Sequence, residues 1–334
     1  MLPSSLVATA YKRLRRSWNK YLFDRTAITV FSTDPLCLRG KSPLFLSMIC
    51  HRDVVGYLLA IKSLYNGVRQ GRVAVINDGS LTLQDLDILS LHIPGIGVFN
   101  VDAIETGCCC RGNTWERLVK IIELSADDYV IQVDADILVS GAIPEVVECW
   151  QANRSFLLGT GSGRRISPVS EAARMVQGWI EAYGWVEPTV CVAAEAALDR
   201  LPDAARRSYV HASSGFAGFA RGGFSMADLE RFSTEMSGIL GERHWNEWGS
   251  EQIASNYMLA NSPDATVLPF PKYACFEPHL PKGDHALLHF IGSYRYNDGV
   301  YRQRAAQFIS CYGRALVPPA DLEPADGAAR SPSL

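Results

Sequence analysis

Residues 129–139 read YVIQVDADILV, an apolar and largely β-branched run that two aspartates, one residue apart, interrupt. Such a run predicts a buried strand, and the aspartates come where that strand should emerge from the core. Because side chains at positions i and i+2 of an extended chain share a face, Asp134 and Asp136 are expected to point at one place. Converging carboxylates repel each other unless a cation lies between them, and hard oxygen ligands suit Mg²⁺ or Mn²⁺. A plainer interpretation stays open, in which the aspartates cap and solvate a strand-to-turn junction.

Strand-like and helix-like segments alternate over the first half of the chain. Short apolar runs predict strands at residues 44–50, 73–76, 97–101 and 129–133. Helical spacing of apolar residues predicts helices at 54–66, 83–91 and 115–125, the second of which begins with Thr82 and Asp85 in the manner of a capping box. This alternation predicts an α/β fold, with a Rossmann-like, mostly parallel central sheet and helices on both of its faces.

Polar residues follow three of the predicted strands. His51 comes after the first strand, Asp78 after the second, and Asp134 after the fourth. In open parallel sheets, ligands bind beyond the carboxyl ends of the strands. We therefore expect the loops that carry these three residues to border one crevice.

The second half of the chain contains a late apolar strand, predicted at residues 287–291, that carries His289. A histidine in such a strand is commonly a satisfied core residue, but beside the acidic pair it is a usable third ligand for Mn²⁺. Gly292 then frees the backbone, and Arg295 follows one short loop later. Arg295 is always charged and can hold a phosphate oxygen, although an ordinary surface ion pair is the alternative. Further strands are predicted at 156–160 and 216–220, an extended piece at 266–269, and helices at 170–183, 226–240 and 250–259.

Two of these motifs resemble those of a known family. The D-x-D sequence at 134–136 and the sequence His289-x-x-Gly292-x-x-Arg295 resemble motifs of GT-A fold nucleotide-sugar glycosyltransferases, in particular the glycogenin and lipopolysaccharide galactosyltransferase group. That group carries a late His-x-x-Gly-x-x-Lys. Here an arginine replaces the lysine, which keeps the charge, and the Pro-Trp that usually follows is absent.

Three further segments resemble the same group, in the same order along the chain. Arg117 takes the place of a lysine in the family's sugar-contacting helix, and residues 213–216 resemble an Asn-x-Gly turn that lacks its asparagine. Residues 251–252, Glu-Gln, resemble the family's Asp-Gln pair. The likeness spans about residues 44–296. The turn at 77–80 instead resembles the Asp-Gly-Ser turn of a second, inverting GT-A family, in which the aspartate, here Asp78, touches the base.

The resemblance implies a metal-dependent glycosyltransferase of the hexosyltransferase class. It implies transfer of a sugar from a nucleotide-diphosphate sugar, a UDP-sugar, to a hydroxyl-bearing acceptor, with retention. Mn²⁺, or Mg²⁺, would lie on Asp134, Asp136 and His289. The implied donor-binding residues are His51, Asp78, Arg117, Asp134, Ala135, Asp136, Gly292 and Arg295.

The resemblance also implies the reacting groups. Gln252 or Glu251 would face the anomeric carbon of the donor sugar. Glu251 also suits the start of a helix, where the helix dipole favours an acid, so a purely structural role stays open. Four tryptophans offer either a stacking wall for the acceptor or ordinary core packing: Trp179, Trp185, Trp245 and Trp248.

Length and charge constrain the organisation of the chain. Its 334 residues suit one large domain, here expected at 42–312, with a nucleotide-binding half at 42–140 and an acceptor half at 141–312. Residues 1–41 form a basic N-terminal segment, and 313–334 are expected to be a disordered tail. The formal net charge of −3 gives no strong attraction to nucleic acid. A short basic helix predicted at 11–23 packs on the domain or touches a membrane surface, so membrane contact is peripheral at most.

Cysteine usage points to a compartment. The nine cysteines are odd in number and show no C-x-x-C spacing, and no secretory leader is evident. We therefore expect reduced thiols and a cytoplasmic protein. No apolar run reaches the roughly 18 residues that a membrane span needs.

Three other functions compete with this interpretation. Residues 133–138 also resemble the first motif of haloacid-dehalogenase-type phosphatases, in which the first aspartate, here Asp134, is a nucleophile. That family places the motif near the start of the fold and later shows Gly-Asp-x-x-x-Asp, whereas Gly283-Asp284 lacks the second acid. A nucleotidyltransferase would show a glycine-rich loop after the first strand, and residues 50–53 contain no glycine. A catalytically inactive nucleotide-sugar-binding protein would need neither acid of the pair.

Overall fold

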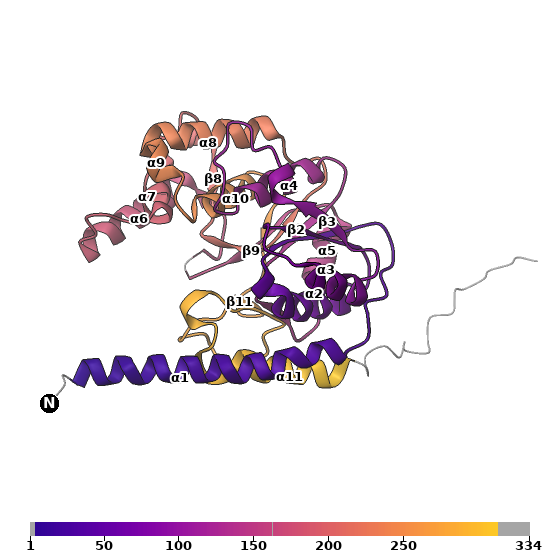
Figure 1. Cartoon of the computed structure of the whole chain (residues 1–334). Helices are drawn as coiled ribbons and strands as arrows, with labels where there is room; N and C mark the ends of the chain where they lie inside the picture. Colours follow the sequence, from indigo (N-terminus) through magenta and orange to yellow (C-terminus); the bar gives the residue numbers. More distant parts are fainter. Residues whose placement is uncertain (1–3, 162, 313–334) are drawn as a thin grey trace, which may run out of the picture.

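A seven-stranded sheet forms the centre of the computed structural model, which describes residues 4–161 and 163–312 (Figure 1). Its strand order is β10-β6-β9-β4-β1-β2-β3. All neighbours pair in parallel except β9, which is antiparallel to both β4 and β6. The α/β class with a mostly parallel sheet is thereby confirmed. The strands are β1 (Leu44–Ile49), β2 (Arg72–Asn77), β3 (Gly97–Asn100), β4 (Val130–Val133), β6 (Phe156–Gly159), β9 (Ala212–Phe219) and β10 (Thr266–Val267).

Each face of this sheet packs against its own hydrophobic core. Because successive side chains of a strand point to opposite faces, Phe45 and Ile49 of β1 join one core, whereas Leu44 and Leu46 join the other. The first core contains helix α2 (Val54–Val68). The second contains α4 (Trp115–Ser125), α8 (Met226–Leu240) and α10 (Ser250–Ala260). Burial on both faces explains why the central strands are nearly continuous apolar runs.

The helix expected at 83–91 illustrates how local chemistry sets an element. Helix α3 runs from Leu83 to His92. The Thr82 hydroxyl accepts a hydrogen bond from the Asp85 amide at 3.2 Å, and the Asp85 carboxylate accepts one from the Thr82 amide at 2.8 Å. These reciprocal bonds satisfy two donors that a helix start leaves free, so the predicted capping box is confirmed.

A second, three-stranded sheet changes the interpretation of residues 129–139. The chain leaves β4 after Val133, turns through residues 134–136, and continues as β5 (Ile137–Val139) in a different sheet. There β5 is antiparallel to β12 (Leu287–His289), which in turn is parallel to β11 (Tyr273–Cys275). The aspartates therefore occupy a turn between two sheets, and not the extended strand from which their common direction was inferred. The small sheet also places His289 directly opposite Ile137, next to that turn.

Strand β9 begins four residues earlier than the strand expected at 216–220, and it includes the segment that was expected to be a turn. Small residues allow this close pairing: a Cβ on Gly218 would lie 2.3 Å from a ring carbon of Phe156 in the neighbouring strand. Locally, a run of serine and glycine suggests a turn, but pairing with β4 and β6 prevails.

The rest of the second half forms α6 (Val169–Tyr183) and several short elements. They comprise α5 (Pro144–Gln151), α7 (Val190–Ala196), α9 (Glu242–Trp245) and the β7–β8 pair (Ser167–Pro168 with Ser208–Tyr209). The expected helices at 170–183, 226–240 and 250–259 are all present with nearly the same ends.

The N-terminal helix α1 (Ser4–Ala27) is longer than the helix expected at 11–23 and lies along α11 (Val300–Tyr312) (Figure 1). Its C-terminal half is part of the core, because Phe23 is buried and stacks on Tyr301 with ring centroids 4.1 Å apart. The expected tail at 313–334 lies outside the described residues. Among those described, no helix combines the length and the apolarity needed to cross a bilayer.

Candidate active site and metal centre

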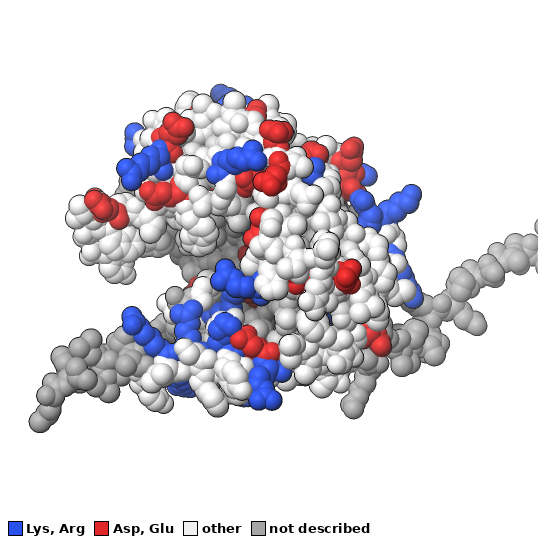
Figure 2. All heavy atoms as spheres, viewed as in Figure 1, with Lys and Arg blue, Asp and Glu red and all other residues white. Residues whose placement is uncertain are grey.

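A cavity of about 710 Å³ lies where the chain leaves β4. The molecule is hollowed between the part that carries α6–α9 and the layer of α1 and α11 (Figure 2). Residues from both expected halves of the domain line the cavity. They include Asp53, Thr114, Arg117, Asp134, Ala135 and Asp136 from the first half, and Ser213, Glu251, Gln252, His289, Gly292 and Arg295 from the second.

The turn that carries the two aspartates is held on three sides. The amide of Asp134 donates to the Gly215 carbonyl at 2.8 Å, and the amide of Phe290 donates to the Asp136 carbonyl at 2.9 Å. On the third side α2 passes close by, since a Cβ on Gly56 would lie 2.7 Å from the carbonyl oxygen of Ala135. Contacts from β9, β12 and α2 therefore fix the position of both carboxylates.

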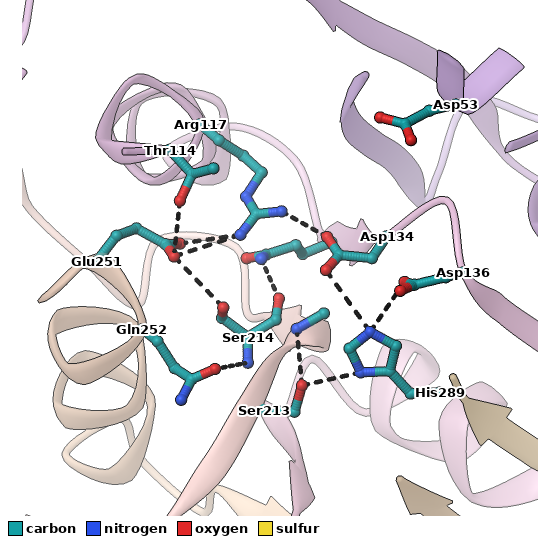
Figure 3. A network of polar contacts seen from close by, with 12 residues as sticks. Asp53, Thr114, Arg117, Asp134, Asp136, Ser213, Ser214, Glu251, Gln252 and His289 are labelled. Carbon is teal, nitrogen blue, oxygen red and sulfur yellow. Dashed lines mark hydrogen bonds and ion pairs between the residues drawn. The ribbon is translucent and has the colours of Figure 1, made fainter. Parts of the chain in front are cut away.

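His289 completes a cluster with the two acids (Figure 3). Its Nε2 lies 3.0 Å from Asp136 Oδ1 and 3.7 Å from Asp134 Oδ2, while its Nδ1 lies 2.9 Å from the Ser213 hydroxyl. One potential ligand atom from each of the three residues falls within 4.8 Å of the others. The imidazole can approach this closely only because position 215 is glycine: a Cβ there would lie 2.1 Å from the His289 Cε1.

The donor set fits a divalent cation. Two carboxylates and one imidazole are ligands that Mn²⁺ accepts, and Mg²⁺ accepts the carboxylates. The Ser213 hydroxyl engages Nδ1 of His289, which leaves Nε2 directed at the acids, as metal-ligating histidines are usually held. Asp134, Asp136 and His289 are therefore the residues that would hold the ion.

Positive groups already neutralise Asp136, which is almost completely buried. Burial disfavours its charge, but His289 and then Arg295 hold the pKa of Asp136 below its usual value. Burial likewise disfavours a charged imidazole, yet Asp136 raises the pKa of His289 well above its usual value. The Arg295 guanidinium forms an ion pair with Asp136 and donates from Nε to the Phe290 carbonyl at 3.0 Å. A metal cation bound here would therefore replace positive charge that His289 and Arg295 now place beside Asp136.

Arg117 of α4 connects the aspartate turn to the start of α10. Its guanidinium lies 2.5 Å from Asp134 Oδ1 and 3.3 Å from Glu251 Oε2. Glu251 also accepts hydrogen bonds from the hydroxyls of Thr114 at 3.2 Å and Ser214 at 3.3 Å (Figure 3). Burial raises the pKa of Glu251, although Arg117 opposes the shift. The Glu251 carboxylate is thus hydrogen-bonded to several neighbouring groups of the protein.

Gln252, the next residue, is held much less tightly. Its side-chain oxygen accepts one long hydrogen bond, from the Ser214 amide at 3.5 Å, and the amide group has no other partner among the described residues. Gln252 lines the cavity and is partly exposed. Of the two residues expected at the reacting centre, Gln252 is thus the one whose polar group is available to a ligand.

His51 and Asp78 are not among the residues that line this cavity. The His51 ring lies 2.7 Å from the Asp85 carboxylate, and Asp78 accepts two hydrogen bonds from Ser80, at 2.9 Å and 2.6 Å. The neighbours of Asp78 line a separate hollow of about 380 Å³. The loop after β1 instead contributes Asp53, which sequence analysis passed over although it follows the same strand.

The four tryptophans divide between core and cavity. Trp245 is fully buried, whereas Trp248 is largely exposed and lines the cavity. Trp179 packs edge-on against His211, another lining residue that the sequence analysis did not single out, with ring centroids 6.4 Å apart. Trp185 stacks on Tyr183. Only Trp248 is therefore available to a sugar in the cavity.

The chain was compared with protein families, curated proteins and solved structures. No protein-family model and no curated protein matches the chain. Solved structures do: GlyE of Streptococcus pneumoniae TIGR4 is similar at 11% identity and a TM-score of 0.46, over 85% of this chain and 66% of that one. The bifunctional WbbM is similar at 14% identity and 0.45, over 82% and 51%, and mouse xyloside xylosyltransferase 1 at 10% and 0.44, over 76% and 98%.

These structures are glycosyltransferases. The chain spans about half the length of WbbM. Likenesses this distant assign no activity, so a function has to come from the residues around the cavity.

Proposed function

We propose that this protein is a metal-dependent glycosyltransferase of the GT-A type, which moves a hexosyl group from a nucleotide-diphosphate sugar to a hydroxyl-bearing acceptor. The observation that carries the proposal is the convergence of Asp134, Asp136 and His289 within 4.8 Å in the wall of a 710 Å³ cavity. A cavity of this size suits a ligand of several hundred daltons. The same wall presents two arginines, Arg117 and Arg295, beside the acids.

The ion would be Mn²⁺ or Mg²⁺, and when bound it supplies positive charge that stabilises the departing nucleoside diphosphate. Arg295 complements that role from the protein side. Its present partner is Asp136, and it follows Gly292, whose φ of +43° favours glycine. We expect Arg295 to exchange the carboxylate for a phosphate oxygen of the donor, because a guanidinium binds both groups in the same way.

The remaining residues orient the site. Ser213 fixes the His289 ring, and Arg117 holds Asp134 and Glu251 in place. Gln252 would face the anomeric carbon of the donor sugar. Glu251 would act chiefly through Arg117, and with the adjoining hydroxyls would orient the donor sugar.

The finer assignments rest on the motifs. A UDP-sugar donor and retention of configuration follow from the likeness of residues 134–136, 251–252 and 289–295 to the glycogenin and lipopolysaccharide galactosyltransferase group. His51 and Asp78 stay in the proposal as contacts for the nucleoside end of the donor, outside the main cavity. The division into a nucleotide-binding half at 42–140 and an acceptor half at 141–312 agrees with a cavity lined by both. A cytoplasmic location is supported by the nine cysteines, all of them free.

The decisive experiment is an assay of the purified protein with UDP-, GDP- and dTDP-sugars, in Mn²⁺, Mg²⁺ or a chelator. We expect release of nucleoside diphosphate from one class of donor, only with a divalent ion. Asp136→Asn should abolish it, whereas Asp127→Asn, a change at an exposed aspartate outside the cavity, should not.

Two other outcomes would overturn the proposal. Release of phosphate from simple phosphate esters, lost in Asp134→Asn, would indicate a phosphatase with Asp134 as nucleophile. Tight metal-dependent binding of a nucleotide sugar without transfer or hydrolysis would indicate a binding protein.

A further inference from the structure

An apolar stripe runs along the free face of helix α1. Tyr11, Leu14, Trp18 and Tyr21 are spaced three, four and three residues apart and are between 48% and 71% exposed. At about 100° per residue this spacing places them on one face of a helix. The helix buries a different face, through Phe23 and the residues after it. Large apolar side chains that share one exposed face usually mark a binding surface.

Helix α1 is also strongly basic. Residues 11–27 contain six lysines and arginines and one acid, Asp24, a net charge of +5 in a chain whose net charge is −3. Lys12 and Arg13 form no ion pair with any residue that the structure describes. Figure 2 shows lysine and arginine side chains gathered on the layer below the hollow, where α1 lies. At the same 100° per residue, Arg13 and Arg15 lie on the two sides of the apolar stripe and Arg25 lies within it, whereas Lys12, Arg16 and Lys20 lie toward the opposite face of the helix.

We propose that α1 docks this protein on an anionic lipid surface. Tryptophan and tyrosine prefer the boundary between water and lipid, because one part of the ring is apolar and the other hydrogen-bonds. Lysines and arginines beside them are attracted to anionic headgroups. A second copy of the chain fits this face less well, because two helices of net charge +5 repel each other.

The position of α1 gives the docking a direction. Arg16 donates to the Gly292 carbonyl at 3.4 Å, Asn19 donates to the Tyr296 carbonyl at 2.9 Å, and Arg15 lies 3.1 Å from Asp298. Gly292 lines the cavity. Helix α1 therefore holds the loop at the rim of the cavity, and a lipid surface bound to the apolar stripe would lie on the other side of α1 from that loop.

The test is co-sedimentation of the full chain with vesicles of phosphatidylglycerol and phosphatidylcholine, or of phosphatidylcholine alone. The wild-type protein should bind the anionic vesicles, and less so at high salt. Leu14→Ser/Trp18→Ser and Lys12→Glu/Arg13→Glu should each bind at least about tenfold more weakly. The matched control, Leu91→Ser/Val186→Ser, removes two exposed apolar residues elsewhere and should bind as wild type.

Thermal unfolding of each variant shows whether it is folded, which we expect because all the altered side chains are exposed. Equal binding to both kinds of vesicle, or wild-type binding by both α1 variants, would overturn the proposal. So would a protein that ignores vesicles and forms a dimer that Leu14→Ser/Trp18→Ser disrupts, since the partner would then be a second copy. Because no readout involves sugar transfer, the result stands apart from the proposed enzymatic activity.

Discussion

At the scale of single residues, the cavity depends on side chains that hold other side chains. His289 reaches the acids only because Gly215 leaves room for its ring and Ser213 meets its Nδ1. Asp134 is held by Arg117, and Asp136 by Arg295. The chemistry proposed for the acids and the histidine therefore depends on neighbouring residues that position them.

Gly215→Ala tests this dependence. The new methyl group would lie 2.1 Å from the His289 ring, so the ring or the strand has to shift. We expect the free energy of unfolding to fall by about 1–3 kcal/mol, as for other overpacked cores. We also expect Gly215→Ala to lose Mn²⁺ binding relative to the wild-type protein, with both measured by titration calorimetry. The matched control is Gly238→Ala in α8, where an added Cβ meets nothing within 4 Å and should be neutral or stabilise by up to about 1 kcal/mol. Full Mn²⁺ affinity in Gly215→Ala would contradict the inferred fit of ring to glycine.

Gln252→Ala tests the reacting side. Gln252 has one long hydrogen bond within the protein, so its removal should leave the melting temperature nearly unchanged. If its amide meets the anomeric centre, kcat should fall by more than about tenfold while donor affinity stays the same. Steady-state kinetics and a melting curve decide the matter, and normal kcat with a lowered melting point would indicate a structural role instead.

The residues of the site were predicted unevenly. Asp134, Asp136 and His289 lie together as expected, because motif chemistry identifies residues that a folded chain must bring together. Arg295 was expected to hold a phosphate, and the structure instead pairs it with Asp136. The expectation that His51 and Asp78 border the same crevice came from a strand-end argument alone. Such an argument predicts at which edge of the sheet a residue lies, but not how far along that edge. Strand β2, which precedes Asp78, is separated from β4 by β1. Asp53 lies in the loop after β1 that was expected to border the cavity, but nothing in the sequence distinguishes it from its neighbours as the residue that lines it.

At the scale of elements, a helix start with a capping box was predictable, whereas the pairing of short strands was not. Helix α3 has its start encoded in Thr82 and Asp85, within one turn of sequence. Strands β5, β11 and β12 are three residues each, too short for periodicity, and β5 pairs with β12 across more than a hundred residues. Helix α11 was missed although its apolar residues carry helical spacing: Tyr301, Ala305, Phe308 and Tyr312.

Asp85→Asn should reveal the contribution of the α3 cap through its pH dependence. Burial opposes ionisation of Asp85, but hydrogen bonds from His51 and Thr82 hold its pKa below the usual value of 3.8. A lowered carboxyl pKa stabilises the fold above that usual value, and the contribution is lost as pH falls through the folded pKa. At neutral pH the variant should therefore be less stable by about 1 kcal/mol, the usual worth of a cap. The difference in stability between the variant and the wild-type protein should shrink at acidic pH. Urea unfolding curves measured at neutral and at acidic pH test this. A constant difference at every pH would show that the charge of Asp85 is unimportant.

At the scale of the whole molecule, the cavity joins parts of the chain that have separate cores. A ligand that contacts both the aspartate turn and β12 binds only the folded chain, so it must raise the stability of the whole. With donor and Mn²⁺ at about 100 times their dissociation constant, the gain is about 2.7 kcal/mol, or roughly 4 °C in Tm for a chain of this length. Differential scanning fluorimetry should show this shift for the wild-type protein and none for Asp136→Asn. A shift that survives in the variant would place the binding elsewhere.

Strand β12 lies next to β5 in the small sheet but comes much later in the sequence, and this has a consequence for protein synthesis. His289 follows Asp136 by 153 residues, so the ribosome completes the acid turn and several further elements long before the histidine emerges. During that interval the nascent protein can fold its early strands, yet it lacks the third ligand and the loop that carries Arg295. The proposed metal site would thus be complete only late in translation. A polypeptide released before β12 would lack the third proposed ligand, and with it the proposed transfer activity.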